Sequence, residues 1–412
     1  MYKNWFSKRI PNQKNRSQKQ GRKSNAMPYY TKLGEIPPKR HTQFRQEDGS
    51  LYHEELVSSI GFSGIYSNLY HCFSPTMVIE MGQASPVKME FDKEYGLKQT
   101  HLKTSQMGDT GTDFLNSRLP MLGNSDVVLY ILQSENLSMP YYYKNGEADE
   151  VIFVHYGSGI LESQFGKLVY MPGDYLVIPR TTIYRIKPNP GKSRFLITES
   201  SSPVETVNRY RNEMGQLLEH SPYCERDIRT PSDVVLEKEP GRYLVRVKKS
   251  GAIHDFIYKH SPFDVVGWDG CLYPYALSIH DFEPITGRIH QPPPVHQTFQ
   301  AKDFVICSFV PRLFDYHPLS IPVPYNHSNI DSDEVLYYVE GNFMSRRGID
   351  TGSFTLHPGG LPHGPHPGTV EAGLGAKETK ELAVMIDTFK PLYPSKQAYE
   401  FLDQNYPYSW IP

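Results

Sequence analysis

Short segments rich in apolar, β-forming residues alternate with turn signals along most of this chain, from Met27 onward. Clear examples are Asp126 to Leu132, Gly166 to Pro179 and Gly241 to Lys248. Glycine, proline and asparagine separate these segments, which is the pattern of strands bounded by turns. The pattern therefore predicts an antiparallel sandwich or barrel, and a protein that is mainly β.

Two further segments have apolar residues every three or four positions, which favours helices. These segments are Ser202 to His220 and Ser395 to Tyr406. The first starts with a serine that can cap a helix and carries an early glutamate. We expect a few such helices at the periphery of the β structure. The proline-rich stretch from His290 to Phe299 is expected to be loop.

One phrase occurs twice in the chain. ADEVIFVHYGSG covers Ala148 to Gly159, and SDEVLYYVEGNF covers Ser332 to Phe343. In each copy six residues separate a glutamate from a glycine, at which we expect the strand to turn (Glu150 to Gly157, and Glu334 to Gly341). Each copy then reaches a Pro-Gly turn, at Pro172 and Pro358. This order predicts a duplicated module, two double-stranded jelly-roll β-barrels.

The second copy carries residues that bind metals. His327 lies seven residues before Glu334, and His363 follows the Pro-Gly turn. Two histidines and one carboxylate on neighbouring strands can form a facial triad, which leaves three adjacent positions of a metal open. This arrangement suits a non-haem Fe(II) ion that must hold both a substrate and O₂.

The first copy lacks these ligands. Tyr143 stands where His327 stands in the second copy, and Tyr184 lies near the position of the later histidine. Tyrosine is a poor Fe(II) ligand because its pKa of about 10 keeps it protonated. The first module is therefore expected to keep the fold without a metal, with Glu150 as a structural remnant or a surface carboxylate.

Composition narrows the class of protein. The 412 residues carry a net charge of −2, which favours neither nucleic acid nor an anionic membrane as a partner. No apolar run approaches the roughly 20 residues of a membrane span. The first 26 residues hold eight Lys and Arg and no acidic residue, and we expect a disordered tail there.

Three stretches of the chain resemble the homogentisate 1,2-dioxygenase family: GFSGIYSNLYHCFSPTMV, VPYNHSNIDSDEVLYYVEGNF and HPGGLPHGP. The resemblance implies a bicupin, a cytoplasmic Fe(II) enzyme of tyrosine and phenylalanine catabolism, and a homo-oligomer, trimeric or hexameric. It also implies cleavage of the ring of homogentisate with O₂ to 4-maleylacetoacetate. Three segments are expected: the tail over residues 1–26, a β domain with the degenerate module over 27–265, and a C-terminal cupin domain with the iron site over 266–412.

The resemblance also assigns roles to single residues. The iron ligands would be His327, Glu334 and His363, and His363 would also lie beside the substrate. His290 would be the base that takes a proton from a ring hydroxyl, with His296 as a rival. The substrate pocket would include Tyr325, Asn329, His357, Phe343 and Arg346, the last as a seat for the substrate carboxylate.

Two departures from the family pattern bear on the site. The family has one residue fewer between the first histidine and the carboxylate, so Asp333 competes with Glu334. The spacing to Gly341, which both copies share, favours Glu334 and turns Asp333 to the other side of the strand. Phe343 stands where the family has a tyrosine whose hydroxyl reaches the substrate or oxygen. Either another group replaces that hydroxyl or the substrate is a variant.

Two alternatives stay open. The first is a bicupin dioxygenase for a related hydroquinone acid such as gentisate, although the gentisate enzymes use three histidine ligands. The second is a non-catalytic bicupin that binds a metal or a small molecule. The complete triad in the second copy argues against the second alternative.

Overall fold

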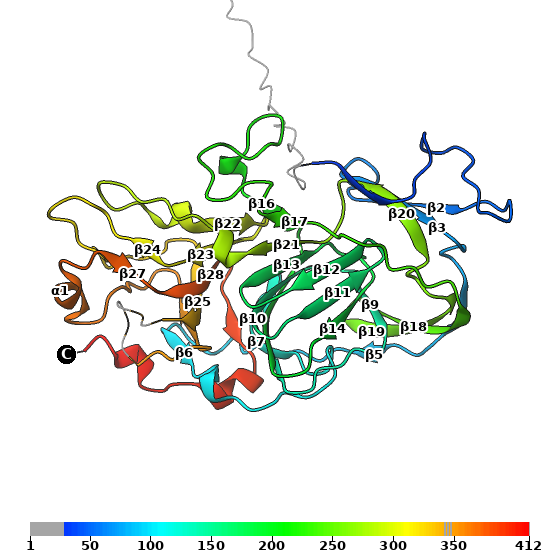
Figure 1. The fold of residues 1–412 in the computed structure, drawn as a ribbon. Coiled ribbons are helices and arrows are strands. Elements are labelled where there is room, and N and C mark those ends of the chain that lie inside the picture. Colours follow the sequence, from blue (N-terminus) through cyan, green and yellow to red (C-terminus); the bar gives the residue numbers. More distant parts are fainter. Residues whose placement is uncertain (1–28, 342, 344–345, 347, 412) are drawn as a thin grey trace, which may run out of the picture.

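The computed structural model of the chain describes residues 29–341, 343, 346 and 348–411. The basic tail expected over residues 1–26 lies outside the described residues. The rest is mainly β with few and short helices, as predicted, and it contains two jelly-roll modules side by side (Figure 1). In the described part of the chain, no helix is long and apolar enough to cross a membrane.

Eight consecutive strands form the first module, and they divide between two sheets. The central strands follow the order β13-β10-β15-β8 in one sheet and β12-β11-β14-β9 in the other, which is the order of a jelly roll. The strands are β8 (Val127–Ser134), β9 (Tyr142–Asn145), β10 (Asp149–Tyr156), β11 (Gly159–Ser163), β12 (Gly166–Tyr170), β13 (Asp174–Ile178), β14 (Tyr184–Pro188) and β15 (Ser193–Ser200).

Further strands extend both sheets of the first module. One sheet gains β17 and β21 at one edge and β7 and β29 at the other, and the second sheet gains β18, β19, β4 and β5. Their bounds are β4 (Val78–Met81), β5 (Ser85–Pro86), β7 (Leu119–Gly123), β17 (Ile228–Arg229), β18 (Pro240–Lys249), β19 (Ala252–His260), β21 (Tyr275–Ser278) and β29 (Tyr393–Pro394).

The second module repeats one sheet of the first. Its central order β23-β28-β25-β26 matches β8-β15-β10-β13, with β25 and β10 carrying the repeated phrase. Opposite this sheet the described residues form only a bridge between His327 and His363 and the short pair β24-β27. The bounds are β6 (Thr100–Leu102), β16 (Glu205–Thr206), β22 (Gln297–Gln300), β23 (Phe304–Phe309), β24 (Arg312–Leu313), β25 (Asp333–Glu340), β26 (Phe354–His357), β27 (Glu378–Thr379) and β28 (Leu382–Thr388).

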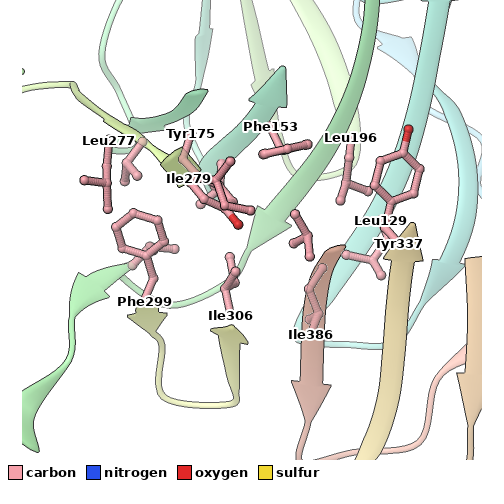
Figure 2. Packing of buried hydrophobic residues seen from close by; sticks show 14 of the residues in the cluster. Leu129, Phe153, Tyr175, Leu196, Leu277, Ile279, Phe299, Ile306, Tyr337 and Ile386 are labelled. Carbon is pink, nitrogen blue, oxygen red and sulfur yellow. The ribbon is translucent and has the colours of Figure 1, made fainter. Parts of the chain in front are cut away.

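The two modules pack against each other through these matching sheets. Phe153 and Leu196 of the first module lie in one buried cluster with Ile306 and Ile386 of the second (Figure 2). Alternate residues of β10 point the other way, into a second core between the two sheets of the first module. Both faces of β10 are therefore buried, which explains the unbroken apolar run of the repeated phrase.

Strand pairing crosses the expected division between residues 265 and 266 in both directions. In the N-terminal sheet, β20 lies between β1 and β3, and β2 forms the far edge (β1, Thr31–Gly34; β2, His53–Ser58; β3, Tyr66–His71; β20, Val265–Gly270). In the second module, β6 and β16 are the two edge strands. The domain division stays a prediction, and the pairing indicates that the two parts fold together.

The helix predicted over Ser202 to His220 is wrong. This segment contains β16, the short 3₁₀ helix η2 (Asn208–Tyr210) and a turn at Gly215, whose φ is +88°. Its regularly spaced apolar residues are buried all the same, because an irregular chain packs them onto the core (Val204, Val207, Tyr210 and Leu217). Pairing of β16 with β22 replaces the helical hydrogen bonds.

The C-terminal segment forms two 3₁₀ helices in place of the predicted helix, η5 (Gln397–Phe401) and η6 (Tyr406–Tyr408). Within the described ranges the single α-helix is α1 (Thr369–Gly373), and the remaining helices are 3₁₀ (η1, Thr104–Gln106; η3, Ile279–Asp281; η4, Pro293–His296). Seven of the ten residues expected as loop from His290 to Phe299 thus lie in η4 or at the start of β22.

The glycine that ends each repeated phrase has the expected turn conformation. Gly157 has φ of +91° and Gly341 has φ of +104°. A Cβ atom on Gly157 would lie 3.0 Å from the carbonyl oxygen of Lys192, and one on Gly341 would lie 2.7 Å from that of Lys380. Both positions therefore exclude a side chain for reasons of backbone angle and of space.

We expect Gly157→Ala to lower the free energy of unfolding by about 1–3 kcal/mol, because alanine is strained at this φ. Urea unfolding followed by far-ultraviolet circular dichroism measures the change. Gly108→Ala is the matched control, since a Cβ atom there meets nothing within 4 Å and its φ is ordinary. Equal stability of the two variants would contradict the strain that we assign to Gly157.

Candidate metal centre

The three predicted ligand residues lie together on the open side of the second module. Each of His327, Glu334 and His363 offers one ligand atom, and these atoms all lie within 4.8 Å of one another. Glu334 is in β25, and the two histidines face each other across a backbone bridge with two N–H···O bonds of 2.8 Å. The bridge holds the two imidazole centroids 4.2 Å apart, so the backbone preorganises the cluster.

The carboxylate of Glu334 contacts both histidines. Its oxygens lie 3.6 Å from Nε2 of His327 and 3.4 Å from Nε2 of His363. Burial by itself raises the pKa of the Glu334 carboxyl, but the nearby imidazoles of His327, His357 and His363 hold that pKa well below its ordinary value. Glu334 is therefore an anion beside the imidazole nitrogens.

The residues fit a metal ion. Nε2 of His363 is buried and has no hydrogen-bond partner, which is a costly state for a polar atom unless a ligand completes it. The side chain of His327 remains 34% exposed, so one side of the cluster is open. Two imidazoles and one carboxylate are donors of first-row transition metals, with room for further ligands.

His357 lies behind Glu334. Its Nδ1 is 2.9 Å from a carboxylate oxygen of Glu334, and its Nε2 is 3.0 Å from the hydroxyl of Tyr406. Burial lowers the pKa of His357 to about 3 despite the raising effect of Glu334, so the imidazole is neutral. Both ring nitrogens of His357 have hydrogen-bond partners, so His357 holds Glu334 in place. We expected His357 in the substrate pocket, but it does not line the adjacent cavity.

Asp333 points to the opposite face of β25, as the alternation of the strand requires. Its carboxylate accepts backbone N–H bonds from Gly359 and Leu392, both of 2.8 Å. Asp387 of β28 stands opposite Glu334 in the sheet, and burial raises its pKa to about 8 with a further contribution from the charge of Glu334. The sequence pattern gave no signal for Asp387, since it lies far from the repeated phrase.

A cavity of about 170 Å³ opens beside the cluster. Most of the residues predicted for the site line this cavity: His290, Tyr325, His327, Glu334, Phe343 and Arg346. Further side chains that the sequence did not single out also line it: Phe309, Arg312, Leu336, Tyr338 and Met385. Asn329 is outside this wall, and its backbone carbonyl accepts a bond of 2.7 Å from the N–H of Gly360. The structure thus gathers six of the nine predicted side chains around one cavity, with His363 in the adjoining cluster.

Arg346 brings a cation to the cavity. Its guanidinium donates a hydrogen bond to the carbonyl of Gly364 and lies over the ring of Trp410, 5.7 Å from the centroid. Its Nε is buried without a hydrogen-bond partner. A guanidinium at the wall of a cavity is a suitable seat for a carboxylate.

The two candidate bases differ in their surroundings. His296 is 4% exposed, packs against Phe309 at 4.5 Å, and burial lowers its pKa to about 3. His290 is more exposed, and its Nε2 lies 3.1 Å from the hydroxyl of Tyr325 at the cavity. A base must reach the substrate proton, so the geometry favours His290 over His296.

The first module has an arginine at the corresponding place. Arg118 donates to Glu150 at 2.5 Å and to the hydroxyl of Tyr184 at 3.1 Å, and its guanidinium lies 5.4 Å from the centroid of Tyr143. Glu150 is 1% exposed and is therefore a structural residue, not a surface carboxylate. In the first module the guanidinium of Arg118 thus neutralises Glu150. In the second module a metal ion would neutralise the corresponding carboxylate, Glu334. Arg118 lies 32 residues before Glu150, in no motif, and sequence reasoning missed it.

Comparison with known proteins gives one family match and several relatives. Residues 73–279 match the family described as homogentisate 1,2-dioxygenase N-terminal. A Saccharolobus solfataricus protein named "Putative dioxygenase" is 42% identical over 386 residues, which cover 93% of this chain and 99% of that protein. The residues that match the family model, 73–279, contain the first module, and the histidine–glutamate cluster lies C-terminal to them.

More distant relatives include two homogentisate 1,2-dioxygenases. That of Bradyrhizobium diazoefficiens is 26% identical, over 65% of this chain and 60% of its own length. That of Pseudomonas putida GB-1 is 27% identical, over 70% of each chain. Among solved structures, an oxalate decarboxylase has a TM-score of 0.33 at 10% identity, over 73% of this chain and 80% of that chain.

Proposed function

From the premise that this chain belongs to the homogentisate 1,2-dioxygenase family of dioxygenases, we propose that it cleaves the ring of homogentisate with O₂. The observation that supports this most is the cluster of His327, Glu334 and His363 beside a cavity that also contains a cation and a candidate base. The proposed product is 4-maleylacetoacetate. One molecule of O₂ is consumed for each ring, and both oxygen atoms enter the product.

Fe(II) is the proposed cofactor, and His327, Glu334 and His363 would hold it. When bound, it would supply open coordination positions and the redox chemistry that lets O₂ react with an aromatic ring. The side chains of the cavity have other tasks. His290 takes the proton of a ring hydroxyl, Arg346 holds the carboxylate, and apolar residues such as Leu336 exclude water from the ring.

A related hydroquinone acid such as gentisate is a second candidate substrate, and Phe343 is the observation that favours it. Phe343 packs against Tyr338 with 4.5 Å between ring centroids, and it has no hydroxyl to offer. The hydroxyl of Tyr325, on the same cavity, is the group we propose in place of the missing one. If the Tyr325 hydroxyl does not reach homogentisate, the preferred substrate is a hydroquinone acid with a different ring substituent.

The assay for this proposal uses protein loaded anaerobically with Fe(II) and then given homogentisate, gentisate or unsubstituted hydroquinone in air. We expect O₂ uptake and a strong near-ultraviolet absorbance with homogentisate. Faster uptake with gentisate would replace the substrate assignment. No uptake with any of the three, in protein that carries iron, would favour a non-catalytic bicupin.

Arg346→Met should raise the KM for homogentisate about 10–100-fold, because the carboxylate loses a charge-assisted hydrogen bond. Turnover of a hydroquinone without a carboxylate should change little. Steady-state O₂ uptake with both substrates measures the difference. Arg226→Met, at an exposed position, is the control. Equal loss for the charged and the uncharged substrate would contradict a carboxylate seat at Arg346.

We also propose that the protein acts in the cytoplasm and assembles with copies of itself, as a trimer or a hexamer. The family membership supports both statements. Light scattering coupled to size-exclusion chromatography measures the mass of the assembly against the 47.2 kDa of one chain.

A further inference from the structure

His290 lies between a carboxylate and a tyrosine hydroxyl. Its Nδ1 is 3.6 Å from Oδ2 of Asp315, and its Nε2 is 3.1 Å from the hydroxyl of Tyr325. The ring of Tyr325 stands at 87° to the imidazole, with 5.2 Å between centroids. The three side chains therefore form a line that ends at the cavity beside the metal cluster.

Asp315 is held in this position by its loop. The side chain is 10% exposed. The hydroxyl of Ser320 donates to the backbone carbonyl of Asp315 at 2.7 Å, and the backbone N–H of His317 donates to the carbonyl of Arg288 at 2.8 Å. These bonds fix the Asp315 loop against the loop of His290, so the carboxylate cannot readily turn to solvent.

We propose that Asp315 is the positioning residue of His290, and this rests on the proposed function of the site. The negative charge of the carboxylate, 3.6 Å from Nδ1, favours a proton on that nitrogen. This selects the tautomer in which Nε2 is unprotonated and faces Tyr325 and the cavity. A carboxylate behind a histidine in this way sets both the orientation and the basicity of the ring.

The charges around His290 determine its protonation. Burial lowers the pKa of His290, the Asp315 carboxylate raises it, and the Arg312 guanidinium lowers it. His296, itself neutral, and Tyr325 are the other titratable groups that face the ring. Loss of the Asp315 charge leaves burial and Arg312 unopposed, so the pKa of His290 should fall further and the imidazole should become a weaker base.

The kinetic test compares Asp315→Asn with wild type, both loaded with Fe(II). We expect kcat to fall about 10–100-fold with KM and iron content unchanged. The acidic limb of kcat/KM, which reports the free His290, should move to lower pH. His290→Gln should slow turnover and keep iron, and adding Asp315→Asn to it should cost nothing more. The control Asp331→Asn, at an exposed position of the neighbouring loop, should match wild type.

A second readout needs neither activity nor metal. In protein labelled with ¹⁵N at histidine, the signals of His290 are those that His290→Gln removes. We expect a protonated Nδ1 and an unprotonated Nε2 in the neutral wild-type ring. A protonated Nε2 there would overturn the proposal, and so would an Asp315→Asn variant with wild-type kcat and pH profile. Absence of O₂ uptake by wild type would instead overturn the proposed function, and the spectrum would still decide the role of Asp315.

Discussion

His363→Ala should lose bound iron and lower O₂ uptake at least about a thousandfold, the largest effect that we expect on activity. The reason is local. Nε2 of His363 is buried, has no hydrogen-bond partner, and lies within 4.8 Å of the ligand atoms of His327 and Glu334. Alanine removes a donor that no neighbouring group can replace, and a metal held by the two remaining ligands dissociates more easily.

Elemental analysis of the purified variant, with O₂ uptake measured on the same sample, tests this expectation. His327→Ala should behave in the same way. His220→Ala replaces an exposed histidine and should leave both iron content and uptake at the wild-type level. A His363→Ala protein that keeps full iron and full activity would remove His363 from the ligand set.

Arg118→Met should have the largest effect on stability, a loss of about 3–5 kcal/mol in the free energy of unfolding. Arg118 lies 2.5 Å from Glu150 and 3.4 Å from Glu199, and the side chains of all three are at most 6% exposed. Removal of the guanidinium leaves buried carboxylates short of their cation. Lys248 still pairs with Glu199, so the penalty falls mainly on Glu150.

Urea unfolding followed by circular dichroism measures this loss. The double variant Arg118→Met, Glu150→Gln should recover part of it, since the uncompensated charge is gone. The control is Arg242→Met, which breaks an exposed pair with Glu80 and should cost at most about 1 kcal/mol. If Arg118→Met were as stable as the control, the guanidinium of Arg118 would not be needed to balance the buried charge of Glu150.

The sequence predicted the strands better than the helices, for a physical reason. Short apolar runs such as Val127–Ser134 are typical of strands with both faces buried, and the two faces of this strand meet two different cores. In the segment from Ser202 to His220, by contrast, apolar residues spaced three or four apart do not require a helix. A short strand, a 3₁₀ helix and a loop bury the same side chains as a helix would. Only the pairing of β16 with β22 decides between the helix and the irregular chain.

The site was predictable where residues stand at fixed offsets from a recognisable phrase. His327, Glu334 and His363 were found in this way, and they lie together. Arg118 and Asp315 were not found, because long-range folding alone brings them to Glu150 and His290. His357 was expected at the substrate and instead supports Glu334, since an offset fixes the strand position of a residue but not its partners.

The repeated phrase thus marks one scaffold that occurs twice with different chemistry in each copy. Glu150 pairs with an arginine that belongs to the chain, and Glu334 faces two histidines and a cavity. The glycine of each copy has a positive φ and follows the corresponding strand, β10 or β25. This contrast explains why the reaction is assigned to the second module.

The central claim is that the cluster in the second module supports dioxygenase chemistry on a hydroquinone acid. The most direct measurement is mass spectrometry of the product that iron-loaded protein forms from homogentisate under oxygen-18 gas. We predict a ring-opened product that contains both labelled atoms of one O₂ molecule. A product without labelled oxygen, or homogentisate recovered unchanged from protein that holds iron, would contradict the account.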